Sequence, residues 1–184
     1  MKSIKSQVKS QIAVFFLLLI SVGSFSQEVE ITKEKTVRNE IKLNLMYLLG
    51  STIDIAYEHI LNENSSLGIS LMHTLNEKNS MWKYGITPYY RMFFGKKEAS
   101  GFFIEGNMAF YSEEINYGTW IYFGTPPPVE FETGFGAGFA IGGKFVNKNG
   151  FLVELYLGAG RNFINTDIIE EYYPRAGISI GKRF

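Results

Sequence analysis

Apolar and polar residues alternate along the C-terminal segment 174–184. Ala176, Ile178 and Ile180 share one face of an extended chain, and small or polar residues lie between them. A period of two is typical of a β-strand with one apolar face. Pro88 lies inside the fourth alternating segment and predicts a bulge or a locally missing ladder bond there. Alternating segments recur along the chain and predict strands at about 40–48, 52–61, 67–75, 82–94, 101–111, 131–146, 151–161 and 174–184.

The connections between these segments alternate in length. Those at 62–66, 95–100 and 147–150 are short, whereas the connection at 112–130 is the longest, and only 49–51 departs from the alternation. Outer-membrane barrels have an even number of antiparallel strands, short periplasmic turns and longer external loops. The pattern therefore predicts an all-β protein, an eight-stranded antiparallel up-and-down transmembrane β-barrel in which the last strand pairs with the first.

The polar faces of the predicted strands carry charges of both signs, and we expect these faces to line the barrel interior. The lumen of eight strands is narrow, which suits the glycine-rich face of segment 131–146 better than the aromatic faces. A basic side chain facing lipid would be unfavourable by about 2–4 kcal/mol near the midplane. Lys182 interrupts the apolar face, but it lies near the chain end, where its stem can reach the headgroups. The predicted lumen charge network comprises Lys42, Asp54, Glu58, Lys83, Arg91, Glu105, Lys144, Glu154, Arg175 and Arg183.

The N-terminus has the three parts of a secretory signal peptide, predicted at residues 1–26. Lysines precede a short apolar run, and Ser24-Phe25-Ser26 offers a cleavage site. Residues 27–39 are charged and aperiodic, and we expect a flexible periplasmic lead before a barrel at 40–184. The chain has no cysteine, which excludes a lipid-anchored cysteine, a disulfide and a thiolate metal site. Cleavage removes three of 18 basic residues and leaves 18 acidic ones, so nothing suggests nucleic-acid binding.

Short motifs add a family resemblance that covers the mature chain: Tyr57-Glu-His, Thr87-Pro-Tyr-Tyr-Arg91, Gly101-Phe-Phe-Ile-Glu105-Gly and Gly177-Ile-Ser-Ile-Gly-Lys-Arg-Phe184. They resemble a family of small bacterial outer-membrane β-barrel proteins catalogued as a domain of unknown function. The architecture is also similar to that of OmpA/OmpX-type eight-stranded barrels. The resemblance implies location in the bacterial cell outer membrane and brings no catalytic residues. We interpret Phe184 as the C-terminal aromatic residue for the barrel-assembly machinery.

Candidate chemistry is sparse. His59 and His73 have no metal-ligand spacing, and the pair His73-Thr74, a possible feature of an outer-membrane lipid-modifying enzyme, would point to opposite faces of one strand. The alternating glycines of segment 131–146 do not match a nucleotide-binding loop. We predict no enzymatic activity, no catalytic residue, no cofactor and no metal. The loop acids Glu113, Glu114, Asp167, Glu170 and Glu171 are interpreted as solvated, with binding of divalent cations or a partner as the alternative.

The most consistent function is structural, or binding of an extracellular or envelope protein partner through the loops at 112–130 and 162–172. The apolar stretch 120–123 hints at a contact surface in the first of these loops. The lipid of the outer membrane would be a further partner. A narrow pore and a lipid-modifying enzyme are alternatives, and a soluble lipocalin-like carrier is the rival in which the apolar faces point inward.

Overall fold

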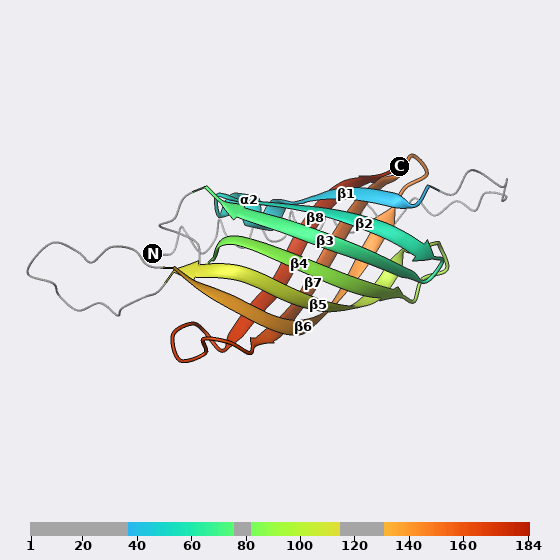
Figure 1. Cartoon of the computed structure of the whole chain (residues 1–184). Helices are drawn as coiled ribbons and strands as arrows, with labels where there is room; N and C mark the ends of the chain where they lie inside the picture. Colours follow the sequence, from blue (N-terminus) through green and yellow to red (C-terminus); the bar gives the residue numbers. More distant parts are fainter. Residues whose placement is uncertain (1–36, 76–81, 115–130) are drawn as a thin grey trace, which may run out of the picture. The chain divides into compact units, whose positions relative to one another are not determined.

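The computed structural model describes residues 37–75, 82–114 and 131–184. Eight antiparallel strands lie side by side in chain order and close into one barrel (Figure 1). The predicted all-β, closed eight-stranded barrel is therefore confirmed. Its strands are β1 (Asn39–Asn44), β2 (Thr52–Asn62), β3 (Ser65–Thr74), β4 (Trp82–Phe93), β5 (Gly101–Glu114), β6 (Phe131–Val146), β7 (Phe151–Asn162) and β8 (Tyr172–Arg183).

The barrel closes where β8 pairs with β1, as the sequence predicts. Glu40 lies opposite Arg183, and Asn44 opposite Ser179. The backbones of Asn39 and Phe184 exchange two hydrogen bonds of 3.1 and 2.8 Å. Asn39 is thus part of the barrel rather than of the expected lead. The predicted signal peptide at 1–26 and most of the predicted lead at 27–39 lie outside the described residues.

The expected strand at 40–48 is wrong beyond Asn44, where a short helix, α2 (Leu45–Leu49), begins. The Asn44 side chain accepts a hydrogen bond from the Met46 backbone N–H at 3.2 Å, which caps the helix. Where β1 has ended, the same side chain bonds to the β8 backbone in place of a neighbouring strand. Its Nδ2 donates to the Ala176 carbonyl and its Oδ1 accepts from the Ile178 N–H. Within the described residues, no helix is long and apolar enough to cross a bilayer.

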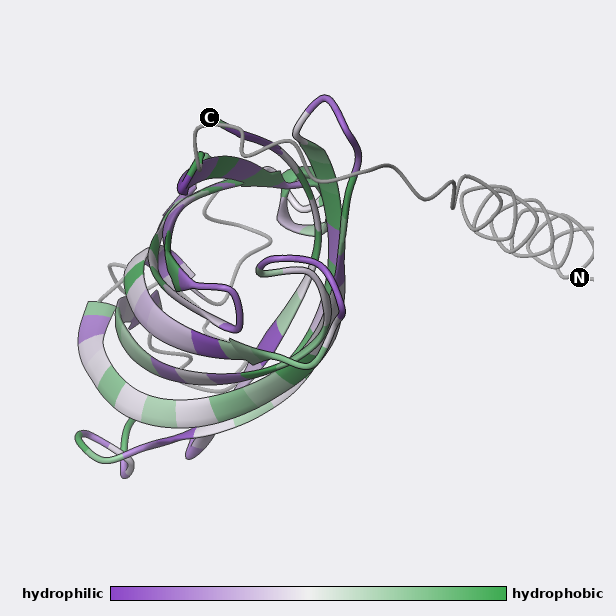
Figure 2. Ribbon diagram, turned by 90° about the vertical axis from the view of Figure 1, so that its right-hand side faces the viewer, coloured by the Kyte–Doolittle hydropathy of each residue, from purple (hydrophilic) through white to green (hydrophobic). Residues whose placement is uncertain are grey.

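The two faces of the wall differ sharply in polarity. On the outer face, Phe139 is 74% exposed and Leu157 is 68% exposed. Their inward neighbours, Ala140 and Tyr156, are buried. Figure 2 shows hydrophilic and hydrophobic residues as alternating bands along the strands, and the strand pleat sends successive side chains to opposite faces. The large side chains of the apolar faces therefore point away from the barrel axis, as the narrow lumen and the charges on the opposite faces predict.

Glycines make room for aromatic rings in the interior. A Cβ atom on Gly68 would lie 2.3 Å from Cζ of Tyr89, and one on Gly160 would lie 2.0 Å from Cζ of Tyr173. Gly134 faces Tyr111, and Gly177 faces Tyr156, in the same manner. The glycine-rich inner face is therefore a packing surface for rings from neighbouring strands.

Strand β4 has two irregular points. Its pairing with β5 omits Thr87 and Pro88 and resumes in the same register, which matches the predicted missing ladder bond. A register shift between Trp82 and Tyr84 turns Trp82 inward, where it stacks on Tyr111 at a centroid distance of 3.8 Å. Strand β5 reaches Glu114, three residues beyond its expected end.

Candidate functional site

Charged side chains form a buried layer inside the barrel, which we call the ionic layer. Nine of the ten predicted lumen residues lie in it, together with Glu40, and it contains five acidic and five basic groups. They come from every strand except β3, which adds the hydroxyl of Ser70. The members are Glu40, Lys42, Asp54, Glu58, Arg91, Glu105, Lys144, Glu154, Arg175 and Arg183.

Glu58 is the centre of the layer. Its carboxylate accepts from Lys42 Nζ, from Lys144 Nζ and, at 3.0 Å, from Arg91 Nη1. The Tyr89 hydroxyl also donates to it at 3.0 Å. Because Glu58 is fully buried, these donors replace the water that a carboxylate would otherwise bind.

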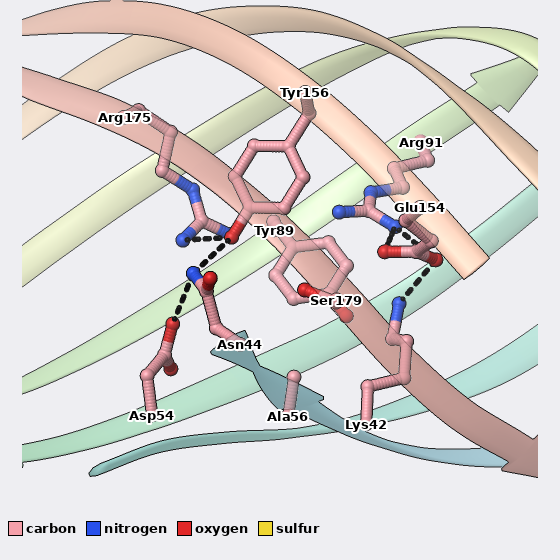
Figure 3. A pocket seen from close by; sticks show the side chains of 10 residues that line it. All are labelled: Lys42, Asn44, Asp54, Ala56, Tyr89, Arg91, Glu154, Tyr156, Arg175 and Ser179. Carbon is pink, nitrogen blue, oxygen red and sulfur yellow. Dashed lines mark hydrogen bonds and ion pairs between the residues drawn. The ribbon is translucent and has the colours of Figure 1, made fainter. Parts of the chain in front are cut away.

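Glu154 and Glu40 continue the network on either side. Glu154 accepts from Lys42 at 2.8 Å and from Arg91 at 2.9 Å (Figure 3). Glu40 accepts from Lys144 at 2.7 Å and from Arg183 Nη2 at 2.7 Å. Carboxylate oxygens of Glu40, Glu58 and Glu154 lie as close to one another as the ligands of a metal ion do. Lysine and arginine nitrogens already contact all of them, so this triplet is an ion-pair cluster.

Two arginines share one carboxylate at the other side of the layer. Glu105 accepts from Arg91 Nε at 2.8 Å and from Arg175 Nε at 2.9 Å. The guanidinium carbons of both arginines also lie within 5.6 Å of the Tyr89 ring centroid. Such contacts stabilise a desolvated cation through the ring quadrupole.

Asp54 is held by uncharged donors. Asn44 Nδ2 donates to Asp54 at 3.1 Å and lies 3.2 Å from the Tyr156 hydroxyl, which in turn lies 3.4 Å from Arg175 Nη1 (Figure 3). The Ser70 hydroxyl donates to the second Asp54 oxygen. Asn44 therefore links the end of β1 to the ionic layer as well as to α2 and β8.

The space left within the layer is small. A cavity of about 10 Å³ lies among the side chains drawn in Figure 3, from Lys42 and Asn44 to Arg175 and Ser179. Such a volume holds roughly one water molecule. The layer thus offers no room for an organic ligand at this cavity.

Among the described residues, side chains from a turn and a loop pack into the two ends of the interior. At the turn end, Ala99 of the β4–β5 turn is fully buried, and Arg183 donates to the carbonyls of Glu98 and Ala99 at 3.1 and 3.0 Å. At the loop end, Ile169 from the β7–β8 loop packs inward. It belongs to an aromatic group that we call the mouth cluster: Trp82, Ala109, Tyr111, Ile169 and Tyr173.

Lys83 is the predicted lumen residue that the structure places differently. Its Nζ lies 4.3 Å from the centroid of the Phe131 ring. The register shift at Trp82 takes Lys83 out of the inward series of β4. His73 and Thr74 point to opposite faces, since His73 is exposed while Thr74 is buried and bonded to Thr52.

Some members of the site were missed from the sequence. Glu40 lies two residues before Lys42, so the same alternation places it inward. Tyr89 and Tyr156 also follow this alternation, but their contacts with the arginines depend on the barrel register. No sequence signal identifies Asn44 as the residue that ends β1.

The comparisons with known proteins give a family. The model of the family described as "Protein of unknown function (DUF3575)" matches residues 13–179. No curated protein and no solved structure gives a significant match, so the similarity to OmpA/OmpX-type barrels stays a prediction. Since the matched residues make up most of the chain, the protein belongs to the DUF3575 family of proteins of unknown function.

Proposed function

We propose that the protein is an integral outer-membrane barrel without enzymatic activity, closed by its ionic layer and available to partners at its loop end. The observation that carries this proposal is the polarity of the wall. Charged groups are buried inside, while large apolar side chains are exposed on every strand. Examples, one from each strand, are Ile41, Ile55, Leu71, Ile86, Phe110, Phe139, Leu157 and Ile180.

A lipid bilayer suits this surface better than water does. Soluble monomers rarely expose contiguous apolar patches larger than a few hundred Å², and here the apolar face runs around the whole barrel. Transmembrane strands need about 9–11 residues, and β4 to β8 have between 12 and 16. The acyl chains of lipids are therefore the proposed partner of the outer face.

The turn end of the barrel has features of a membrane boundary. Phe94, Phe102, Phe145 and Phe151 are exposed there. The Nζ of Lys182 lies 4.2 Å from the centroid of the Phe151 ring and donates to the Asn149 carbonyl in the adjacent turn. Aromatic rings and a lysine with its tip turned to polar groups are typical of the interface.

Export and assembly complete the proposal. The signal peptide predicted at 1–26 would deliver the chain across the inner membrane. Strand β8 ends at Arg183 and is followed by Phe184, whose side chain is exposed, and this strand would be the element that the barrel-assembly machinery binds. An extracellular or envelope protein is the proposed partner of the loops.

Fractionation and gel mobility test this proposal. We expect the protein in the outer-membrane fraction, solubilised only by detergent, and with a mobility on denaturing gels that changes on boiling because the closed barrel resists unfolding. Recovery of folded protein from the periplasm without detergent would contradict it.

Electrical recording separates the closed barrel from a narrow pore. Since the ionic layer and both covered ends fill the interior, we expect no steady conductance in planar bilayers. A steady conductance that Arg91→Ala or Glu105→Ala changes would favour the pore.

A further inference from the structure

Within the part of the chain that the structure describes, three buried polar atoms at the loop end have no partner that meets hydrogen-bond distance and angle: Glu113 Oε2, the Tyr111 hydroxyl and Asn162 Oδ1. Their residues are 6%, 2% and 2% exposed. A buried carboxylate oxygen without a donor is unfavourable. In the ionic layer, by contrast, each carboxylate meets several donors. The loop end therefore needs a separate explanation.

The three residues lie around one surface of β6. Tyr111 and Glu113 are two positions apart on β5 and point to the same face. Gly134 and Gly136 of β6 leave space between β5 and β7. A Cβ atom on Gly134 would lie 2.8 Å from the Tyr111 hydroxyl, and one on Gly136 would lie 2.8 Å from Asn162 Oδ1. The glycines thus let side chains of β5 and β7 approach each other across β6, where the Tyr111 hydroxyl makes a weaker contact with the Asn162 side chain and lies close to the Glu113 carboxylate.

The β7–β8 loop brings a second acid to this place. Asn162 Nδ2 donates to the Glu170 carbonyl, so its oxygen is the end of the amide left for another group. The Glu170 backbone makes a hydrogen bond with the Glu113 carboxylate, which leaves Oε2 without a donor, and the Glu170 carboxylate lies near enough to repel it. The nearby Arg161 is engaged with Glu171 at 2.9 Å. Two carboxylates, an amide oxygen and a hydroxyl therefore gather beside the mouth cluster.

Oxygen atoms of carboxylates and amides are the ligands of hard divalent cations. We propose that Glu113, Asn162, Tyr111 and Glu170 form a site for one Ca²⁺ or Mg²⁺ ion, which ties the β7–β8 loop to β5. The ion would supply the positive charge that Glu113 lacks. The sequence places Glu113 and Glu170 among acids that could bind divalent cations, but it does not bring Tyr111 and Asn162 to them, because the ligands come from two strands and a loop. The site lies inside the loop end of the barrel and does not depend on the proposed membrane location.

The test uses the full barrel in detergent, treated with EDTA and dialysed. In a Trp120→Phe background, Trp82 is the remaining tryptophan, and its stacking on Tyr111 makes its fluorescence a reporter of the site. Titration with CaCl₂ and with MgCl₂ should give saturable binding of one ion. Sites of extracellular modules bind Ca²⁺ at about 10⁻⁴–10⁻³ M, and we expect that range.

Glu113→Gln should weaken binding at least tenfold, while the boiling-dependent gel mobility shows that the barrel still forms. Glu171→Gln is the matched control, since it removes the same charge from an exposed side chain and should leave binding unchanged. Asn162→Asp adds a carboxylate and should tighten binding. The proposal is overturned if the wild-type chain shows no saturable response, or if Glu113→Gln binds as well as the wild type. If the wild-type chain shows no saturable response, the Glu113 carboxyl is protonated rather than bound to an ion.

Discussion

The ionic layer and the loop end occupy the same narrow barrel but treat buried charge in opposite ways. Glu58, in the layer, has donors from Lys42, Lys144, Arg91 and Tyr89. Glu113, at the loop end, has an oxygen with no donor. The difference indicates that the layer is complete by itself and closes the interior, whereas the described residues leave the loop end incomplete.

Removing the central carboxylate should give the largest effect. Glu58→Gln keeps the shape but leaves Lys42, Lys144 and Arg91 with one acid fewer in a buried site. Breaking a buried ion pair from one side costs roughly 3–5 kcal/mol, so we expect a loss of that size in urea unfolding of the detergent-solubilised barrel. Glu171→Gln, which breaks only the exposed pair with Arg161, should change stability by less than about 1 kcal/mol. Equal effects of the two variants would show that the layer is not central to stability.

A methyl group on an inward glycine should have the next largest effect. Gly68→Ala places its Cβ against the Tyr89 ring, which also contacts Glu58. Overpacking of this kind is unfavourable by about 1–3 kcal/mol, again measured by urea unfolding. Gly106→Ala is the matched control, because the nearest atom to its Cβ is 4.0 Å away. If both variants unfold alike, the rings are not packed on the glycines.

The seam where β1 gives way to α2 should respond locally. Asn44→Ala removes the helix cap and the contacts with Ala176 and Ile178, and loss of a cap alone costs about 1 kcal/mol. We expect faster amide hydrogen exchange at Ile178 and Met46, while amides of β5 and β6 keep their rates. Unchanged exchange at Ile178 would mean that the Asn44 side chain does not hold the β8 edge.

At the loop end, removal of charge should have the smallest effect and the opposite sign. In the absence of divalent cations, Glu113→Gln replaces a buried carboxylate, one oxygen of which has no donor, by a neutral amide. We expect stability to rise by up to about 1 kcal/mol, in contrast to Glu58→Gln. A large loss in Glu113→Gln would show that the two regions are built alike.

Alternation along the chain predicts the strands and their faces well, because one buried face imposes a period of two on each strand. Strand β6 has its expected bounds, and the inward charges of β2, β5 and β7 are where the pattern puts them. The alternation predicts wrongly after Asn44. Leu45 and Tyr47 continue it, but the Asn44 side chain caps a helix there and β1 ends. The alternation also fails at Trp82, where a register shift reverses the faces.

The contacts across the interior could not be predicted for a different reason. Which acid meets which base depends on the stagger between strands, and Glu40 and Lys144, 104 positions apart, meet only after the barrel closes. The environment of Glu113 likewise depends on Gly134, Gly136 and the path of the β7–β8 loop. Single segments carry no information on such distant pairings.

The central claim is that the apolar face contacts acyl chains while the charged face is sealed from them. Because the chain has no cysteine, single nitroxide labels at Leu157→Cys, on the outer face, and Lys148→Cys, in the exposed turn between β6 and β7, can be compared in lipid vesicles. Collision rates with oxygen, which partitions into the bilayer, and with a water-soluble nickel chelate are the measurement. We predict high oxygen and low nickel accessibility at position 157 and the reverse at position 148. A label at position 157 that meets the nickel chelate freely, with oxygen access no higher than at position 148, would contradict the account.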